Sequence, residues 1–401
     1  MSKVSRRQPT GVILSLKDEF TKALQNQPEP PRRKRWTPGV VWDGDEGTVT
    51  TSTIGGERNP DWDHVLRHWG LDPELFEVVE PVLFNSWGGE DGGNNRQYKA
   101  RVIRRTISGV DLEPLIKEAL RRKPSKKVFE GEGVLNVVLA DWQIGKNDGD
   151  GLEGTIERVI NAREGVIRRV KELRSIGRGI SKLNVLWTGD SIEGCVGFYP
   201  SQTFNVELDR RDQVKVTRRL LLDSLMAWSK HFTEITVAAV AGNHGENRAD
   251  GKSFTTLHDN DDLAIVEMVE EILHANPETF GHIKFLYPRD ALTLTLESAG
   301  WILGLTHGHV ARSGATPEMK LKTWWQKQAG GKQPIGDADV LVSGHYHHLR
   351  LADWGGCVWI QAPAMDGGSD WWKLSSGEVS EAGMVTFAMY PDTRVTDFQV
   401  L

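Results

Sequence analysis

A chain of 401 residues with 38% hydrophobic content can form one large domain and a smaller one around a substantial core. Its two cysteines exclude a disulfide framework and a thiolate metal site, so any metal must be held by oxygen and imidazole. No apolar run is long enough to cross a bilayer, which excludes a membrane-spanning helix and makes the cytoplasm the expected location.

The formal net charge of −6 conceals two strongly basic segments. Residues 1–35 contain nine Lys and Arg against three acids, and residues 96–127 contain eleven against three, so they carry +6 and +8 and leave −20 for the rest. This asymmetry favours a polyanionic partner such as nucleic acid, and some of the fifteen tryptophans could stack on bases. A solvated tail, an ordinary charged helix face and buried tryptophans are the alternatives.

The first third of the chain divides into two predicted parts. Residues 1–60 are rich in Pro, Arg, Gly and Thr and are expected to form a flexible basic arm. Residues 61–127 are expected to form a small α+β accessory module that could bind nucleic acid. Helical spacing predicts helices over 61–71 and 111–122, and alternation predicts a basic strand over 96–107.

From residue 128 to residue 401 the pattern is that of an α/β domain, which we expect to be catalytic. The expected strands cover 134–140, 183–188, 235–241, 301–306 and 338–343, and the expected helices cover about 153–175, 208–230 and 261–274. The strands are apolar throughout, as in a sheet that helices cover. Short strands after residue 345 predict a second sheet packed on the first.

Polar side chains follow every one of these predicted strands. They are Asp141 and Gln143, Asp190 and Glu193, Asn243 and His244, His307 and His309, and His345 and His347. Each alone has an ordinary explanation, such as a turn, a cap or a buried histidine with a hydrogen-bond partner. Because open α/β sheets gather their sites at the carboxyl ends of strands, five such endings in order predict one shared site.

The donor types in this set predict metal-assisted chemistry. Carboxylate and amide oxygens mixed with imidazoles, without sulfur, suit Mn²⁺, Mg²⁺, Fe or Zn²⁺. Two such ions roughly 3.5–4 Å apart can generate a hydroxide and hold both oxygens of an in-line displacement at phosphorus. The predicted reaction is phosphoester hydrolysis, in which Asn243 is a neutral ligand and His244 is a general acid or anion stabiliser.

The order of Asp141, "GDSIE", "GNHGE", "HGH" and "GHYH" over residues 134–365 resembles the calcineurin-like metallophosphoesterase superfamily. The resemblance implies a four-layer α/β/β/α sandwich, here with a small N-terminal α+β module. A large, tryptophan-rich chain with such a module also resembles the metallophosphoesterases encoded by actinobacterial phages. That resemblance would place the protein in the cytoplasm of a host bacterium.

The resemblance also implies a ligand set for two divalent ions. The first ion would be held by Asp141, Gln143, Asp190 and His347, and the second by Asp190, Asn243, His307 and His345. Asp190, Asn243 and His244 are the expected catalytic residues. Gln143 stands where the family usually has histidine. Its carbonyl oxygen is a harder and weaker donor, which favours Mn²⁺, with Mg²⁺, Fe or Zn²⁺ as alternatives; a pseudo-enzyme without a first site is the competing reading.

Substrate and partners are less constrained by the sequence. His309 and Arg248 could contact the substrate, or could make a loop hydrogen bond and a surface salt bridge instead. The basic segments favour a phosphodiesterase or nuclease acting on DNA or RNA. A phosphatase or phosphodiesterase for a small molecule or phosphoprotein is the alternative, followed by a non-catalytic scaffold. A homodimer is compatible with the sequence.

Overall fold

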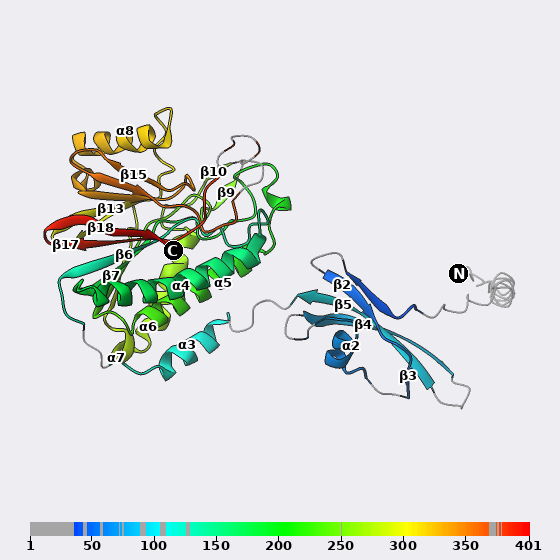
Figure 1. Cartoon of the computed structure of the whole chain (residues 1–401). Coiled ribbons are helices and arrows are strands. Elements are labelled where there is room, and N and C mark those ends of the chain that lie inside the picture. Colours follow the sequence, from blue (N-terminus) through cyan, green and yellow to red (C-terminus); the bar gives the residue numbers. More distant parts are fainter. Residues whose placement is uncertain are drawn as a thin grey trace, which may run out of the picture. The chain divides into compact units, whose positions relative to one another are not determined.

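The computed structural model of the chain divides into two compact units between residues 106 and 107. Each unit is described by itself (Figure 1). The residues described are 36–42, 46–56, 59–71, 73, 76–88, 94–104, 110–125, 129–249, 251–368, 374, 377 and 379–401. The expected basic arm up to residue 35 lies outside them.

In its described residues, the smaller unit is an antiparallel sheet with one helix. Its elements are β1 (Gly39–Trp42), β2 (Glu46–Thr50), β3 (Ile54–Gly55), α2 (Trp62–His68), β4 (Phe76–Gly88) and β5 (Asn94–Arg104). Strand β5 is central and pairs with β2, β3 and β4. Its alternate residues Ala100 and Val102 are buried with Leu66 of α2, whereas Lys99 and Arg101 fall on the opposite register positions. The predicted basic strand is therefore present, and only one of its faces is apolar.

The expected domain boundaries differ from the structure at two places. The expected flexible arm contains strands β1 to β3 of the smaller unit, at residues 39–42, 46–50 and 54–55. Their Val and Thr residues suit a strand, and this local signal was outweighed by the Pro and Arg content of the preceding residues. Helix α3 (Leu112–Arg121), expected to close the accessory module, belongs to the larger unit. Its Leu115 and Ala119 are fully buried in that unit's core.

The described part of the larger unit contains two large sheets and one short two-stranded one. The elements of the first sheet and its helices are β6 (Gly133–Leu139), α4 (Gly151–Ser175), β7 (Ile180–Trp187), α5 (Arg210–Trp228), β8 (Glu234–Ala239), α6 (Asp261–His274), α7 (Pro277–Phe280), β11 (Ile283–Leu286), β17 (Val385–Tyr390) and β18 (Thr393–Val400). Its strand order is β11-β8-β7-β6-β17-β18, with the first four strands parallel. A 3-10 turn at Gln202–Phe204 and the short pair β9 (Arg248–Ala249) and β10 (Lys252–Ser253) lie in its loops.

The second sheet has the order β12-β13-β14-β16-β15. Its elements are β12 (Thr293–Ser298), β13 (Trp301–Thr306), α8 (Pro317–Gly330), a 3-10 turn at Pro334–Asp337, β14 (Val340–Ser343), β15 (Arg350–Asp353) and β16 (Val358–Gln361). Strands β13, β14 and β16 are parallel. The predicted α/β class is confirmed. All five predicted strands and three predicted helices are present; the bounds of β13 and α6 are those expected, and no other end differs by more than three residues.

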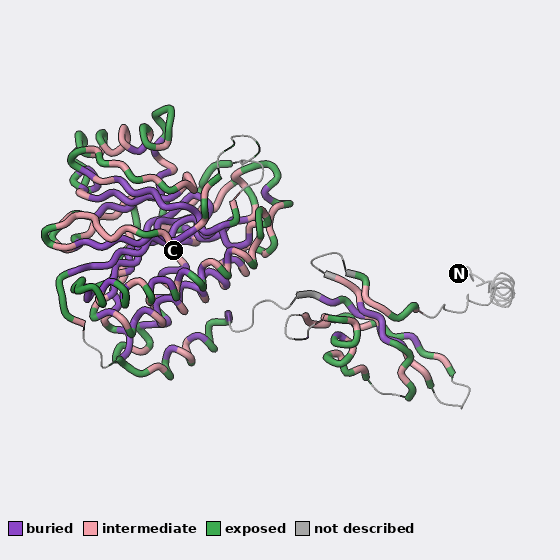
Figure 2. Tube along the Cα trace, in the orientation of Figure 1, coloured by how far each residue is buried: buried purple, intermediate pink, exposed green. Residues whose placement is uncertain are grey.

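Three cores separate the layers of the larger unit. Successive residues of β6 face opposite sides, so that Val137 packs with the helices α4, α5 and α6 while Val138 packs between the two sheets. On the far side of the second sheet, Trp359 packs with Leu321 of α8. The layers are therefore helices, sheet, sheet and helix, and Figure 2 shows the buried strands at their centre. All seven residues of β6 are buried, as expected of a strand covered on both faces.

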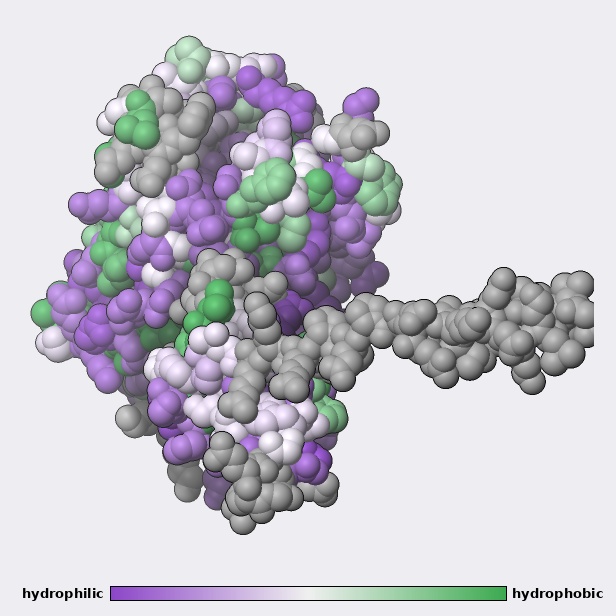
Figure 3. Space-filling view, turned by 90° about the vertical axis from the view of Figure 1, so that its right-hand side faces the viewer, coloured by the Kyte–Doolittle hydropathy of each residue, from purple (hydrophilic) through white to green (hydrophobic). Residues whose placement is uncertain are grey.

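No helix in the described part of the chain is both long and apolar enough to cross a bilayer. On the face drawn in Figure 3, hydrophilic residues predominate among those that are described, and apolar ones are scattered. Four tryptophans, Trp142, Trp187, Trp228 and Trp359, are fully buried, and none of the tryptophans whose burial the structure describes is exposed. These tryptophans stabilise the fold, and they give little support to base stacking.

Candidate metal centre

The predicted site residues come together at one end of the two sheets. Asp141 follows β6, Asp190 follows β7 and Asn243 follows β8, while His307 and His345 follow β13 and β14. Because β6, β7 and β8 are parallel, as are β13 and β14, the carboxyl ends of each set lie at one edge. The two edges meet at the site, since both sheets share a core.

The backbone is strained at these positions. Eight residues other than glycine in the described part of the chain have a positive φ angle, and five of them are predicted ligands: Asp141 (49°), Gln143 (43°), Asp190 (53°), His345 (74°) and His347 (57°). Left-handed backbone is unfavourable for such residues and persists where function or packing requires it. Gln143 has the same left-handed backbone conformation as the other four of these predicted ligands, as expected of a residue that belongs to the site.

Glycines allow two loops to approach the buried carboxylates. A Cβ atom on Gly242 would lie 2.1 Å from Asp190 Oδ1, and one on Gly344 would lie 2.5 Å from Asp141 Oδ2. Both distances are shorter than any real carbon–oxygen contact. The "GN" and "GH" pairs in the sequence are therefore explained by close packing of backbone on carboxylate.

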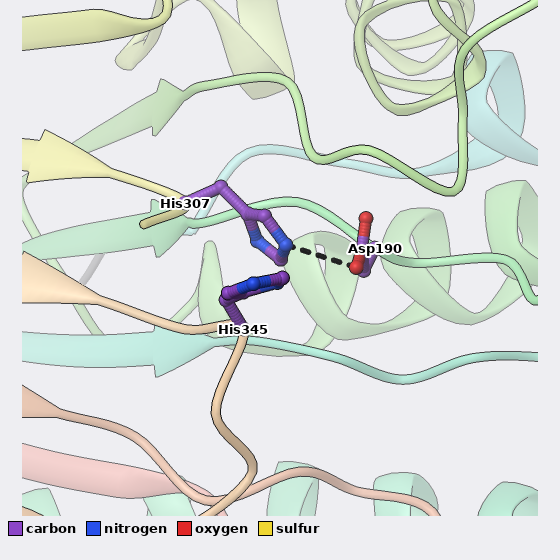
Figure 4. Close-up of side chains that lie close together, drawn as sticks. All are labelled: Asp190, His307 and His345. Atoms are coloured by element: carbon purple, nitrogen blue, oxygen red, sulfur yellow. Dashed lines mark ion pairs between the residues drawn. The ribbon is translucent and has the colours of Figure 1, made fainter. Parts of the chain in front are cut away.

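One cluster of donor atoms converges around His307 (Figure 4). One ligand atom from each of Asp190, His307 and His345 lies within 4.8 Å of the others. His307 Nε2 is 2.9 Å from Asp190 Oδ2 and 3.1 Å from Asn243 Oδ1. On the other side of the ring, Nδ1 donates to the carbonyl of Thr188 at 2.8 Å. That bond orients the ring and leaves Nε2 as its ligand atom.

This cluster fits a divalent cation. It offers a carboxylate oxygen, an amide oxygen and two imidazoles, with no sulfur, which is a donor set suited to Mn²⁺, Fe or Zn²⁺. Asp190 and His307 are buried, and Asn243 is 9% exposed, so the donors are held out of bulk water. A cation placed among them would take over the position that a proton on Nε2 occupies between two oxygen acceptors.

The charges in the cluster are strongly coupled. Burial opposes the charged form of Asp190, but the neighbouring His307 and His244 hold its pKa well below the ordinary value. Burial likewise opposes the charged form of His307, but Asp190 raises the pKa of that imidazole to about 9. Burial and the charge of His307 lower the pKa of His345 to about 2. In the metal-free protein, the imidazole of His307 is therefore protonated at neutral pH, whereas that of His345 is neutral.

Metal binding is consequently expected to depend on pH. A ligand imidazole must be neutral, so below pH 9 a cation must displace the proton of His307. The affinity for Mn²⁺ should rise by about tenfold per pH unit from pH 6.5 and level off near pH 9, with about one proton released per ion. Calorimetry in buffers of different ionisation enthalpy measures both quantities. Equal affinity at pH 6.5 and pH 8.5 would contradict the assignment of His307 as a ligand.

The other half of the predicted set has different partners. Asp141 Oδ1 lies 3.5 Å from His347 Nε2, and this carboxylate raises the pKa of His347 although burial opposes it. Gln143 Oε1 accepts a hydrogen bond from Lys146 Nζ at 3.2 Å. The same ammonium pairs with the buried Asp366, whose carboxylate is 3.9 Å from His347 Nδ1. Here the structure brings the predicted residues near one another but adds a lysine among them.

His244 is held beside the metal cluster by several contacts. Its backbone N–H donates to Asp190 Oδ1 at 2.8 Å, and its Nδ1 donates to the carbonyl of Glu193 at 2.7 Å. The carboxylate of Glu193 lies 3.5 Å from the same nitrogen. Phe198 stacks on the ring with centroids 4.3 Å apart, and the guanidinium of Arg248 lies over the ring of Phe198. The ring is thus fixed, with Nε2 as the nitrogen available to a substrate.

A pocket of about 440 Å³ lies beside this centre and is predominantly cationic. It is lined by Glu246, Arg248, Gly251, Lys252, Ser253, Leu292, His309, Val310 and Arg312. Both residues predicted to contact a substrate, His309 and Arg248, are among them. His309 is 5.4 Å from His307 between ring centroids, and its Nδ1 is buried without a partner among the described residues. Arg248 also pairs with Glu246, as the alternative reading expected.

The sequence did not reveal the residue that braces the loops. Asp262, at the start of α6, is fully buried and accepts hydrogen bonds from the backbone of Asp190, Ser191 and Gly242. It also accepts from the hydroxyl of Ser191. Two ligand loops are therefore tied to one carboxylate. A usable signal was present, because "NDD" before an apolar helical pattern marks a helix start where an acid can face the strand ends.

Two further residues of the site were missed. Lys146 is three positions after Gln143 in the same loop, where it read as part of a polar glycine-rich stretch. Asp366 follows β16, which makes β16 a sixth parallel strand that is followed by a polar residue of the site. Applying the strand-end rule to that short strand would have found it.

No family model matches the chain, and no curated protein matches it. Solved structures do resemble it. Vacuolar Protein Sorting 29 from Cryptosporidium parvum is 14% identical with a TM-score of 0.29, over 68% of this chain and 99% of that one. A predicted phosphoesterase from Streptococcus pneumoniae is 14% identical, with a TM-score of 0.26 over 67% and 97%. A novel archaeal phosphodiesterase is 9% identical, with a TM-score of 0.29 over 67% and 99%. Likenesses this weak decide nothing about function, which rests on the geometry above.

Proposed function

We propose that this chain is a metal-dependent phosphoester hydrolase of the calcineurin-like metallophosphoesterase type, and that its substrate is a phosphodiester in DNA or RNA. The observation that carries the proposal is the convergence of Asp190, Asn243, His307 and His345, with His244 anchored to the same carboxylate. A bound divalent ion supplies Lewis acidity and lowers the pKa of a bound water. Mn²⁺ is the ion we expect, because oxygen donors contribute half of these ligands.

The protein groups have separate tasks in this proposal. The carboxylate of Asp190 and the amide of Asn243 hold the cation with the two imidazoles. His244, with Nδ1–H committed to the carbonyl of Glu193, presents Nε2 to the leaving-group oxygen and can give it a proton. The carboxylate of Glu193 lies 3.5 Å from the same Nδ1 and helps to hold the ring in this orientation. Phe198 and Arg248 keep the ring in place.

The basic residues support a polynucleotide substrate, but the structure separates and partly neutralises the second of the two basic segments in the sequence. The basic segment 96–127 is divided between the two units, since β5 lies in one and α3 in the other. On α3 part of the charge is paired, as in Lys117 with Glu113 and Arg122 with Glu118. Within the larger unit, the cationic pocket offers Lys252 and Arg312 to a phosphate group.

The proposal is tested by offering four substrates with Mn²⁺. These are labelled single-stranded DNA, labelled double-stranded DNA, an aryl phosphodiester and an aryl phosphomonoester. Cleavage of a DNA substrate, weakening steeply with salt, is the expected result. Cleavage of the aryl diester or monoester without degradation of DNA would favour the phosphatase or small-molecule alternative. No hydrolysis with any of several metals would favour a non-catalytic scaffold.

The cationic pocket gives a prediction about substrate affinity. Arg312→Ala should raise KM for a DNA substrate by roughly tenfold, because one charge-assisted contact to a phosphate is lost, and leave kcat nearly unchanged. Arg168→Ala, on an exposed position of α4, is the matched control and should leave both constants unchanged. Steady-state kinetics at fixed ionic strength provides the measurement. An unchanged KM in the Arg312 variant would remove this pocket from the substrate path.

A further inference from the structure

We propose that the ammonium of Lys146 takes the place of the first divalent cation, so that the chain binds a single divalent ion at the cluster of Asp190, Asn243, His307 and His345. This inference rests on the proposed function, because it concerns the same site. It replaces the expectation that Gln143 is a weak ligand of the first ion.

The contacts of Lys146 are those of a built-in cation. Its Nζ donates to Gln143 Oε1 at 3.2 Å and pairs with Asp366. The side chain of Lys146 is 12% exposed and that of Asp366 is 3% exposed. Burying a charged pair is costly unless both charges are well compensated, so a lysine held in this way is unlike a solvated surface lysine. The interaction joins residues 220 positions apart in the chain, at the ends of β6 and β16.

The same contacts leave little room for a metal ion on Gln143. A cation bound to Gln143 Oε1 at about 2.2 Å would share that oxygen with the ammonium and could lie no more than about 5.4 Å from Nζ. Two cations this close repel each other strongly, and the neutral amide that they would share supplies no bridging negative charge of the kind that Asp190 would supply between two metal ions. Among the described acids and imidazoles, ligand atoms of at least three residues converge within 4.8 Å only at Asp190, His307 and His345. Neither Asp141 nor His347 is part of that convergence.

Glutamine rather than histidine at position 143 is consistent with an ammonium in place of a metal ion. Histidine at position 143 would provide a lone pair to a metal but would have no acceptor for an ammonium once metallated, whereas the glutamine carbonyl accepts from Lys146. The ammonium of Lys146 lies between Gln143 and Asp366, and Asp366 is close to His347. This ammonium therefore places a fixed positive charge in the half of the site where the first metal ion was expected. Lysine is a common phosphate-binding group, so the ammonium can also donate a hydrogen bond to an anionic substrate.

Counting metal ions tests the inference without any substrate. The metal-free full-length chain is dialysed against Mn²⁺, and its bound metal is measured by mass spectrometry. Electron paramagnetic resonance then shows whether the bound Mn²⁺ ions are isolated or exchange-coupled. We expect one ion per chain and the hyperfine pattern of an isolated ion. The double variant Gln143→His/Lys146→Ala should bind a second ion and give an exchange-coupled signal. Lys182→Gln, at an exposed position of β7, should behave as the wild type.

Two ions per wild-type chain with an exchange-coupled signal would overturn the inference, as would no bound ion. The wild-type count needs no variant, so poor folding of the double variant leaves the test intact. Failure of the proposed function is distinguishable, because a chain that binds one ion and hydrolyses none of the four substrates keeps this inference and loses the other. A chain that hydrolyses DNA with two bound ions does the reverse.

Discussion

Replacing Asp190 by Asn is expected to abolish metal binding and hydrolysis together. The side chain keeps its shape, so the bond from the backbone N–H of His244 to Oδ1 can persist. The charge that attracts the cation and lies 2.9 Å from His307 is lost, however. We expect the Kd for Mn²⁺ to rise by about 10³-fold or more and kcat/KM to fall by at least about 10³-fold, since the metal supplies several kcal/mol of transition-state stabilisation.

Calorimetry with Mn²⁺ and hydrolysis of the best substrate measure the two effects in Asp190→Asn. Thermal unfolding of the metal-free variant shows whether the fold is retained. Asp392→Asn, in an exposed turn, is the matched control and should leave metal binding and activity unchanged. A folded Asp190→Asn protein that binds Mn²⁺ with the wild-type Kd would show that this cluster is not the metal centre.

His244→Ala should separate catalysis from metal binding. His244 touches the metal cluster through its backbone, which the substitution keeps, whereas its ring is the proposed proton donor. Loss of general acid catalysis typically lowers the rate by 10²–10⁴-fold, and we expect kcat to fall within about that range. The number of bound ions and their Kd should not change. The defect should be smaller for a substrate whose leaving group needs no proton, such as an aryl phosphodiester.

That dependence on the leaving group distinguishes a proton donor from a residue that only supports the loop. His274→Ala, a half-exposed histidine on α6, serves as the control and should retain full activity. An equal loss of kcat for aryl and alkyl diesters would argue against the general acid role. A simultaneous loss of bound metal would place His244 among the supports of the cluster instead.

Most of the core architecture was accessible from local pattern. The strands β6, β7 and β8 are apolar runs bounded by turns, and the helices α4, α5 and α6 have apolar residues at helical spacing, so each reports its own structure through periodicity. The N-terminal boundaries were less accessible. β1 to β3 are short strands stabilised by pairing with β5, and α3 was correctly expected as a helix although its burial in the larger unit depends on distant residues.

The site was predictable in outline for the same reason. Asp141, Asp190, Asn243, His307 and His345 follow strands, and parallel strands deliver their carboxyl ends to one edge, so chain order alone brings these residues together. The structure also explains why glycines lie beside these residues. Several of the site residues have positive φ angles, and glycines pack directly against the carboxylates of Asp141 and Asp190. Asp262 supports the same loops from a helix, so no strand pattern pointed to it.

The sequence by itself determined the α/β class, the succession of strands and helices along the chain and the chemical types of the donors that follow the strands. These follow from periodicity and from residue identity. The tertiary structure decided what surrounds Gln143. Lys146 and Asp366 are far apart in the chain, and their pairing arises only when the loops after β6 and β16 fold against each other. Whether a glutamine meets a metal ion or an ammonium depends on that long-range contact, which no local pattern encodes.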